Sequence, residues 1–308
     1  MSRTTHNLVL HPQVSQALAQ GQAVVALEST IISHGLPSPR NYEVAHEIEQ
    51  SVRDGGAVPA TIAILDGAVH VGLDSQQLAR LADPASNVVK VSTRDLGPII
   101  AARGNGATTV SATSHIAHLA GIKFFATGGL GGVHRGAQDN WDESADLVTL
   151  ARTPITVVCA GVKSILDVGA TIERLETLGV TVVGFQTQQF PGFYRADSGY
   201  EVPWRVDTVE QAALVAQERD AIHAPGAIVL TQAVSATDEL DSRLHDRVLA
   251  EGLDAAHAEH IVGKEVTPFL LDWFHTHTNN QSLEVNVILI KANARLAAAV
   301  AQASVVMA

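Results

Sequence analysis

The chain has 308 residues, a formal net charge of −12 and 46% hydrophobic residues, and its 20 cations are 15 arginines and five lysines. This hydrophobic fraction supports a sizeable core and excludes a mainly disordered chain, while the excess of acids and the lack of basic runs argue against nucleic acid as a partner. A single cysteine, Cys159, excludes an internal disulfide, and no apolar run reaches membrane-spanning length, so we expect a cytoplasmic protein that does not contact membranes.

Short β-branched segments alternate with amphipathic patterns along the chain. Strands are predicted over residues 23–27, 124–127, 155–159, 180–185 and 227–230, with a hairpin over 59–73 that turns at Asp66-Gly67 and a short strand that ends at Lys90 and Val91. Helices are predicted over residues 42–54, 76–81, 96–102, 114–120, 164–178, 209–218, 235–258, 267–274 and 283–303. This alternation is typical of an α/β fold. Because no linker or repeat divides the chain, we expect one domain over residues 1–308.

The longest irregular segment covers residues 186–206 and contains two prolines and five aromatic residues. A loop of this length is uncommon inside a compact domain, so a lid or an oligomer contact is one interpretation. A surface segment that packs on its own aromatic side chains is the other.

Several familiar motifs are not matched. The glycine loop, residues 128–132, is followed by His134 where a dinucleotide fingerprint needs its third glycine, and Lys163 is not adjacent to a glycine as in a P-loop. No histidine pair has the helical i, i+4 spacing of a zinc site. The absence of a Gly-x-Ser-x-Gly elbow excludes an α/β-hydrolase.

Charged residues that follow apolar strands are the first candidates for a site, because open α/β sheets place their sites at the carboxyl ends of strands. Glu28 ends the strand over residues 23–27, where burial would let it keep a proton and act as a general acid. A helix cap or an ion-paired acid is the alternative for Glu28. Lys90 also ends an apolar segment, and taken alone it fits a solvated edge lysine better.

Lys163 follows a nearly wholly apolar strand and lies near the start of a predicted helix. Both surroundings destabilise an ammonium group and so are expected to favour a neutral amine. A neutral amine at this position is the chemistry that a Schiff-base nucleophile requires. A lysine that extends from the strand end into solvent is an equally supported alternative.

Two polar segments are candidate ligand sites. Residues 139–146 contain Asp139, Asp142, Glu143 and Asp146, which could hold Mg²⁺ or Mn²⁺ through oxygens, or could simply cap the next helix. Residues 106–114 open a helix with several hydroxyl groups, which predicts a phosphate site or a capped helix.

Four of these segments resemble the pseudouridine-5′-phosphate glycosidase family, also called the indigoidine synthase A family. They read ALESTIISHGLP from Ala26, GGLGGVHRG from Gly128, SADL from Ser144 and CAGVKSILD from Cys159, and the similarity continues to Asn286 and residues 293–295. The resemblance implies a three-layer α/β/α sandwich with a mixed, mostly parallel sheet. It also implies a homotrimer and a divalent cofactor such as Mn²⁺.

The same resemblance implies an activity. Members reversibly split pseudouridine 5′-phosphate into uracil and ribose 5-phosphate, a lyase reaction of the hydro-lyase class that serves nucleotide breakdown. By matching positions, Lys163 would be the nucleophile that forms an imine with C1′ of the ribose, Glu28 the proton donor and Asp142 the metal ligand. The implied substrate contacts are Lys90, Val110, Ser144, Ala145 and Asp146, to which His134 and Asn286 are added because they lie in matching blocks.

The chain departs from the family pattern at three places: Gln188 and Gln189, Asn279 and Asn280, and Ala292. These departures put loop geometry and contacts to the base in doubt. Two other functions are compatible with parts of the sequence. A strand-end Schiff-base lysine also fits a class I aldolase that acts on another phosphorylated sugar, and a regulatory protein that binds a sugar phosphate without catalysis is the third possibility.

Overall fold

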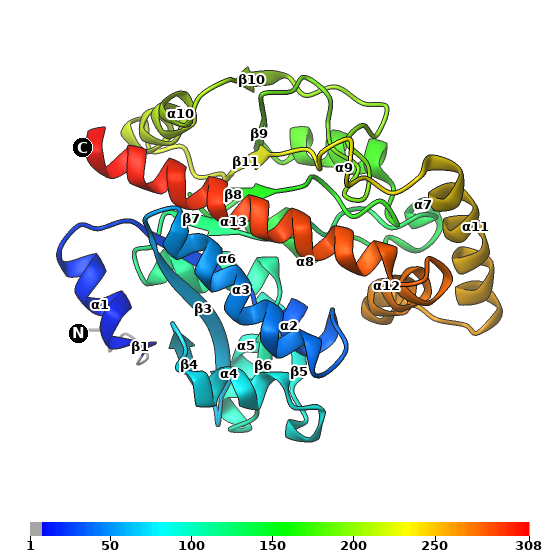
Figure 1. Ribbon diagram of the computed structural model, residues 1–308, viewed down its shortest axis with the longest axis horizontal. Coiled ribbons are helices and arrows are strands. Elements are labelled where there is room, and N and C mark those ends of the chain that lie inside the picture. Colours follow the sequence, from blue (N-terminus) through cyan, green and yellow to red (C-terminus); the bar gives the residue numbers. More distant parts are fainter. Residues whose placement is uncertain (1–7, 308) are drawn as a thin grey trace.

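The computed structural model describes residues 8–307, whose arrangement is shown in Figure 1. The strands form one sheet in the order β1-β4-β3-β2-β7-β8-β11-β9-β10, with β6 beside β3 and β5. Their bounds are β1 Leu8–Leu10, β2 Val24–Leu27, β3 Val58–Leu65, β4 Ala68–Val71, β5 Val89–Val91, β6 Gly106–Thr108, β7 Phe124–Ala126, β8 Thr156–Cys159, β9 Thr181–Phe185, β10 Trp204–Val206 and β11 Ile228–Thr231. Within residues 8–307, β3 pairs antiparallel with β4 and β6, and the other pairings are parallel.

Helices cover both faces of this sheet, with α13 and α3 in front of it and α6 and α8 behind it in the view of Figure 1. Their bounds are α1 Pro12–Ala19, α2 Thr30–His34, α3 Arg40–Asp54, α4 Ser75–Ala82, α5 Leu96–Ala101, α6 Val110–Leu119, α7 Ala137–Asn140, α8 Ala145–Leu150, α9 Val168–Thr177, α10 Val209–Ala221, α11 Ser242–Ala258, α12 Val266–His277 and α13 Gln281–Met307. The predicted α/β/α sandwich with a mixed, mostly parallel sheet is therefore confirmed. None of these helices is both long and apolar enough to cross a membrane.

The central strands are buried on both faces, as expected for parallel strands covered by two helix layers. Leu27 of β2, Ala126 of β7 and Val158 of β8 lie side by side in register. The residues that follow these three strands consequently emerge together at one edge of the sheet. This edge carries the candidate site.

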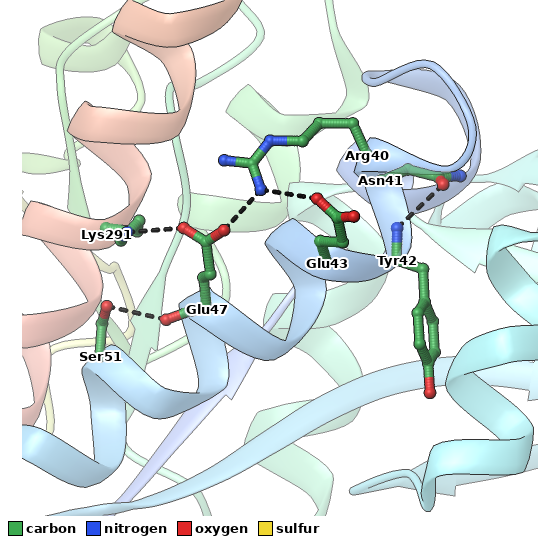
Figure 2. A network of polar contacts seen from close by, with 7 residues as sticks. All are labelled: Arg40, Asn41, Tyr42, Glu43, Glu47, Ser51 and Lys291. Atoms are coloured by element: carbon green, nitrogen blue, oxygen red, sulfur yellow. Dashed lines mark hydrogen bonds and ion pairs between the residues drawn. The ribbon is translucent and has the colours of Figure 1, made fainter.

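Helix α13 packs along α3, and a polar network joins the two helices (Figure 2). Glu47 on α3 accepts hydrogen bonds from Lys291 Nζ on α13 at 2.6 Å and from Arg40 at 2.5 Å. Lys291 and Arg40 thereby hold the pKa of Glu47 below its usual range. The network joins α3 to α13, the long helix that also carries Asn286 and Asn293.

Several predicted elements have the expected positions, including the hairpin of β3 and β4, which turns at Asp66 and Gly67 with φ of 52° and 77°. Three predictions at element ends were wrong. Residues 106–108 form β6 before helix α6 begins at Val110, and α11 begins at Ser242 instead of residue 235. Helix α9 begins at Val168 instead of residue 164, because Asp167 caps it by accepting a hydrogen bond from Ala170 N.

The segment over residues 186–206, which was predicted to be irregular throughout, ends in strand β10, and the part before β10 is anchored by aromatic side chains. Phe190, Phe193 and Tyr194 are at most 1% exposed, and Gly192 forms a bridge to Gly161 in the turn after β8. This agrees with the interpretation of a segment packed on its aromatic residues. An oligomer contact through this segment stays a prediction.

Candidate active site

A cavity of about 420 Å³ opens at the carboxyl ends of the central strands. It is lined by all ten residues that the sequence predicted as site residues: Glu28, Lys90, Val110, His134, Asp142, Ser144, Ala145, Asp146, Lys163 and Asn286. These residues come from segments as distant as β2 and α13. The fold therefore brings the whole predicted set to one place, while the role of each residue stays a prediction.

Lys163 lies in the post-β8 turn, which we define as residues 160–167. Its Nζ donates a hydrogen bond to Gly129 O at 2.8 Å, and its backbone N–H donates to Leu130 O at 3.2 Å. The predicted position after a buried strand is confirmed. The predicted position at a helix start was wrong, because α9 begins five residues later, at Val168.

Gly161 makes the post-β8 turn possible. Its φ of +76° is in the left-handed region, and a Cβ atom there would lie 2.1 Å from Pro191 O. A residue with a side chain would therefore push the segment over residues 186–206 away from the cavity wall.

Glu28 follows β2 and is close to Lys163 and to Thr127, which follows β7. Burial raises the pKa of Glu28, while the Lys163 ammonium and a hydrogen bond from Thr127 Oγ1 act in the opposite direction. Glu28 is partly buried and lines the cavity, in agreement with the expected desolvation, and its role as an acid stays a prediction. A protonated carboxyl in the cavity is suited to general-acid chemistry.

Lys90 projects from β5 into the same cavity. Burial lowers its pKa, and the nearby charge of Lys163 lowers it further, while Asp146 and Glu28 oppose this effect. Lys90 does lie on an edge strand, since among the described strands β5 pairs with β6 only, but its side chain lines the cavity and is partly buried. Two amines therefore share one cavity with the carboxyl groups of Glu28, Asp142 and Asp146.

Asp146 is 5% exposed and joins two backbone segments. Its Oδ1 accepts a hydrogen bond from Ser111 N at 2.9 Å, near the start of α6, and its Oδ2 accepts one from Gly131 N at 2.8 Å. Ser144 caps α8 by accepting from Asp146 N at 3.2 Å, as the capping alternative expected. A Cβ atom on Gly131 would lie 2.3 Å from Ser144 Oγ, so the glycine loop can approach only because this position lacks a side chain.

The acidic segment does not converge as a cluster. Asp139 is exposed and is not among the residues that line the cavity, and Glu143 accepts a hydrogen bond from Arg174 Nε at 2.9 Å. Asp142 does face the cavity, where its Oδ2 lies 3.7 Å from His134 Nδ1. Within residues 8–307, no group of three His, Cys, Asp or Glu side chains is arranged to hold a metal ion.

Val110 is the first residue of α6, Ala145 is the first residue of α8, and Asn286 reaches the cavity from α13. Asn286 is 4% exposed, and its Oδ1 lies 3.2 Å from the position that a Cβ atom on Gly128 would occupy. Backbone amides and one side-chain amide therefore add polar groups to the wall.

Two residues that support the site were not singled out from the sequence. Thr127 hydrogen-bonds Glu28, and Asn293 Nδ2 donates to Thr127 O at 2.9 Å and to Gly128 O at 3.3 Å. The position of Thr127 at the end of a predicted strand was the available signal for it. Asn293 lies inside a long helix, and no local pattern indicates that it reaches the strand ends.

The three departures from the family pattern lie outside the residues that line the cavity. Asn279 and Asn280 adopt φ of 49° and 63° between α12 and α13, a conformation that asparagine tolerates better than most residues. Ala292 lines a separate groove beside Arg40 and Glu47. The doubt about contacts to the base is therefore not supported at these positions.

Comparison with known proteins adds independent information. A family profile described as "Indigoidine synthase A like protein" matches residues 13–303. The pseudouridine-5′-phosphate glycosidase of Salinispora tropica is 57% identical over 98% of this chain and 93% of its own length, and that of Streptomyces griseus is 56% identical over 96% and 92%. The crystal structure of the prealnumycin C-glycosynthase AlnA in complex with ribulose 5-phosphate has a TM-score of 0.90, 36% identity and 99% coverage of both chains. An indigoidine synthase A-like protein from Thermotoga maritima has a TM-score of 0.87, 34% identity and 98% coverage of both chains.

Proposed function

This chain belongs to the indigoidine synthase A like family, and from that premise we propose that it reversibly cleaves the C–C glycosidic bond of pseudouridine 5′-phosphate to give uracil and ribose 5-phosphate. The observation that carries the proposal is that Glu28 and Lys163 meet in one cavity at the ends of β2 and β8. Relatives of 46–57% identity that are named for this activity support the choice of substrate.

The bond itself requires an electron sink. A C–C glycosidic bond has no leaving oxygen or nitrogen that an acid can protonate, so the paired-carboxylate route of ordinary glycosidases does not apply. A lysine amine supplies the alternative, because its nitrogen lone pair can stabilise a developing positive charge at C1′ as an iminium ion.

In the cleavage direction, Lys163 Nζ attacks C1′ while the ring oxygen O4′ leaves and takes a proton, for which Glu28 is the donor. Protonation of the base at C5 then lets the C1′–C5 bond break. Its electron pair returns to the base, and the Lys163 lone pair closes the C1′=N double bond. Water hydrolyses this imine and releases ribose 5-phosphate, and the free amine is regenerated.

The phosphate needs compensation in a protein of net charge −12. We assign this task to Lys90, which lies in the same cavity, with the backbone at Val110 and the segment of Ser144, Ala145 and Asp146 as further substrate contacts. His134 and Asn286 complete the proposed contacts. The hydrogen bonds of Asp146 to backbone amides suggest that it also shapes the cavity.

A divalent cation fits these residues if Asp142 is its one carboxylate ligand and water and the substrate phosphate supply the others. Mg²⁺ and similar hard ions commonly use one or two carboxylates together with water and substrate phosphate, and do not need a cage made only of protein. Asp142 would hold Mn²⁺ in this way, one ion per subunit, with His134 beside it. Such an ion supplies positive charge that offsets the phosphate.

Three further properties are proposed on family grounds. They are a role in nucleotide breakdown in the cytoplasm, a homotrimeric assembly, and classification as a hydro-lyase. Light scattering on the purified protein tests the assembly, since a trimer has three times the 32.4 kDa mass of the chain.

A related activity is C-glycoside synthesis on another acceptor, as the name prealnumycin C-glycosynthase indicates for AlnA. The lower identity of AlnA, 36% against 46–57% for the named glycosidases, favours pseudouridine 5′-phosphate. An aldolase that acts on another sugar phosphate has no such support.

The direct test is to incubate the protein with pseudouridine 5′-phosphate and Mn²⁺ and to measure uracil and ribose 5-phosphate. Borohydride added during turnover should leave a reduced ribose 5-phosphate adduct on Lys163, identified by peptide mass spectrometry. Absence of uracil release, together with turnover of an aldol substrate, would overturn the proposal.

A further inference from the structure

A Ser-His-Asp cluster lies directly behind the proposed nucleophile. Ser164 follows Lys163 in the chain, and its Oγ lies 2.8 Å from His245 Nε2 on helix α11. The Nδ1 atom of the same ring lies 2.9 Å from Asp246 Oδ1. Ser164 and His245 are buried, at 6% and 4% exposure, whereas the Asp246 side chain is 68% exposed.

The cluster is not placed to act as a hydrolytic triad. Neither Ser164 nor His245 is among the residues that line the cavity, so a substrate held there does not reach the serine oxygen. The sequence around Ser164 also lacks the elbow that exposes a serine nucleophile. The arrangement must therefore be explained by what it does to its neighbours.

The partners of His245 define the direction of its hydrogen bonds. Burial lowers the pKa of His245 and so favours the neutral ring, whereas Asp246 acts in the opposite direction. A neutral ring that donates from Nδ1 to the Asp246 carboxylate has an accepting lone pair on Nε2. Ser164 then donates its hydroxyl proton to His245, and the serine is held in one orientation.

This bond gives the post-β8 turn an anchor on α11 in addition to its bonds to the glycine loop. On the cavity side, Lys163 is held by Leu130 O through its backbone N–H and by Gly129 O through Nζ. One residue later, Ser164 contacts α11 through His245, and its carbonyl accepts a hydrogen bond from Arg135 at 3.3 Å. Lys163 therefore lies between two anchored segments of backbone.

We propose that His245, oriented by Asp246, is a positioning residue that acts through Ser164 to keep Lys163 Nζ directed at C1 of the bound sugar phosphate. The inference rests on the proposed Schiff-base function. Its physical basis is that nucleophilic attack needs the reacting atoms in near-attack geometry, and a misplacement of 1 Å can cost about 100-fold in rate.

The test measures imine formation alone, with ribose 5-phosphate as the probe and borohydride as the trap. The wild-type protein is compared with His245→Leu, Ser164→Ala and Asp246→Ala, and with His245→Gln, whose amide can still accept from Ser164. Ser51→Ala is the matched control, because Ser51 is also a buried serine with one hydrogen bond, to Glu47 O at 2.9 Å on α3.

We expect the trapping rate to fall about 10- to 100-fold in His245→Leu and Ser164→Ala, and less in Asp246→Ala, with the affinity for ribose 5-phosphate changed less than about twofold. His245→Gln should recover most of the rate, and Ser51→Ala should keep it. Thermal melting separates these effects from unfolding. If His245→Leu does not fold, the exposed position of Asp246 and the small change at Ser164 keep the comparison informative.

One outcome overturns the positioning role and leaves the Schiff-base function standing. In it, the wild-type protein is trapped on Lys163, and folded Ser164→Ala and Asp246→Ala are trapped at the same rate. An equal loss in the Ser51→Ala control also contradicts it, because the effect would then be general. If the wild-type protein gives no adduct, the proposed Schiff-base function fails, and the inference fails with it.

Discussion

The Thr127 hydroxyl donates a hydrogen bond to the Glu28 carboxyl across the adjacent ends of β7 and β2. This bond favours the ionised form of Glu28, whereas burial favours the protonated form and has the larger effect. The protonation of the proposed acid thus depends on burial, which raises its pKa, and on the Thr127 hydrogen bond, which lowers it.

The first prediction follows from the sign of these effects. Thr127→Val removes the bond that lowers the pKa of Glu28, so the pKa rises further and the carboxyl keeps its proton to higher pH. The limb on which activity falls as Glu28 ionises should therefore move to higher pH in a kcat/KM profile. Thr113→Val, which removes a buried hydroxyl bonded to Thr108, should not move it. A shift to lower pH would contradict the assigned role.

A substitution of the acid itself should act on turnover more than on binding. Glu28→Gln keeps the size of the side chain but has no carboxyl proton to donate, and loss of a general acid costs about 100- to 10,000-fold in rate. We expect ribose 5-phosphate to bind with nearly unchanged affinity, measured by calorimetry. A variant with wild-type turnover would exclude Glu28 as the proton donor.

The third prediction separates charge from nucleophilicity at position 163. Lys163→Arg retains the positive charge, but a guanidinium does not form an imine. Activity should decrease by at least about 1,000-fold, as is typical when a nucleophile is removed, and borohydride should trap no sugar. Lys123→Arg is the control, since Lys123 pairs with Asp220 at 2.9 Å away from the residues that line the cavity. Trapping that persists in Lys163→Arg would point to Lys90 as the reactive amine.

The fourth prediction concerns the proposed cation. Chelation should abolish activity, and added Mn²⁺ should restore it, if charge compensation of the phosphate depends on the ion. Asp142→Asn should weaken Mn²⁺ binding at least about tenfold, since loss of even an outer-shell partner has that effect. Electron paramagnetic resonance of free Mn²⁺ measures this affinity without turnover. Asp139→Asn, an exposed change outside the lining residues, should leave the affinity unchanged.

The sequence predicted the site better than it predicted the element ends, for physical reasons. Side chains at the ends of parallel strands converge wherever the strands are neighbours, so the apolar strands before Glu28 and Lys163 marked both residues as candidates, while their roles came from the family resemblance and stay predictions. The start of α9 could not, because it depends on the cap at Asp167 and on the turn at Gly161, whose left-handed conformation accommodates Pro191 O from a distant segment. Lys163 therefore lies in a turn and not at a helix start.

Contacts between distant segments were likewise not readable from local patterns. The bond between Ser164 and His245 joins residues 81 positions apart, and Asn293 reaches Thr127 from 166 positions away. Composition gave one partial hint. In a chain with only five lysines, two lie in the cavity, where an amine is chemically distinct from a guanidinium.

The last prediction concerns stability at the contact of α3 with α13 (Figure 2). The side chains of Glu47, Arg40 and Lys291 are 33%, 33% and 35% exposed, so solvent screens the network, and Glu47→Gln should cost about 0.5 to 1 kcal/mol in unfolding free energy at pH 7. Because the folded-state pKa of Glu47 is lowered, its contribution is present above the unfolded-state pKa and is lost as the pH falls through the folded-state value. Wild type and variant should therefore converge in urea unfolding at acidic pH. Glu43→Gln is the control: its side chain is 60% exposed and contacts Arg40, so its effect at pH 7 should be smaller. If the difference in unfolding free energy between wild type and Glu47→Gln widens with acidification, the stabilisation by Glu47 is not ionic.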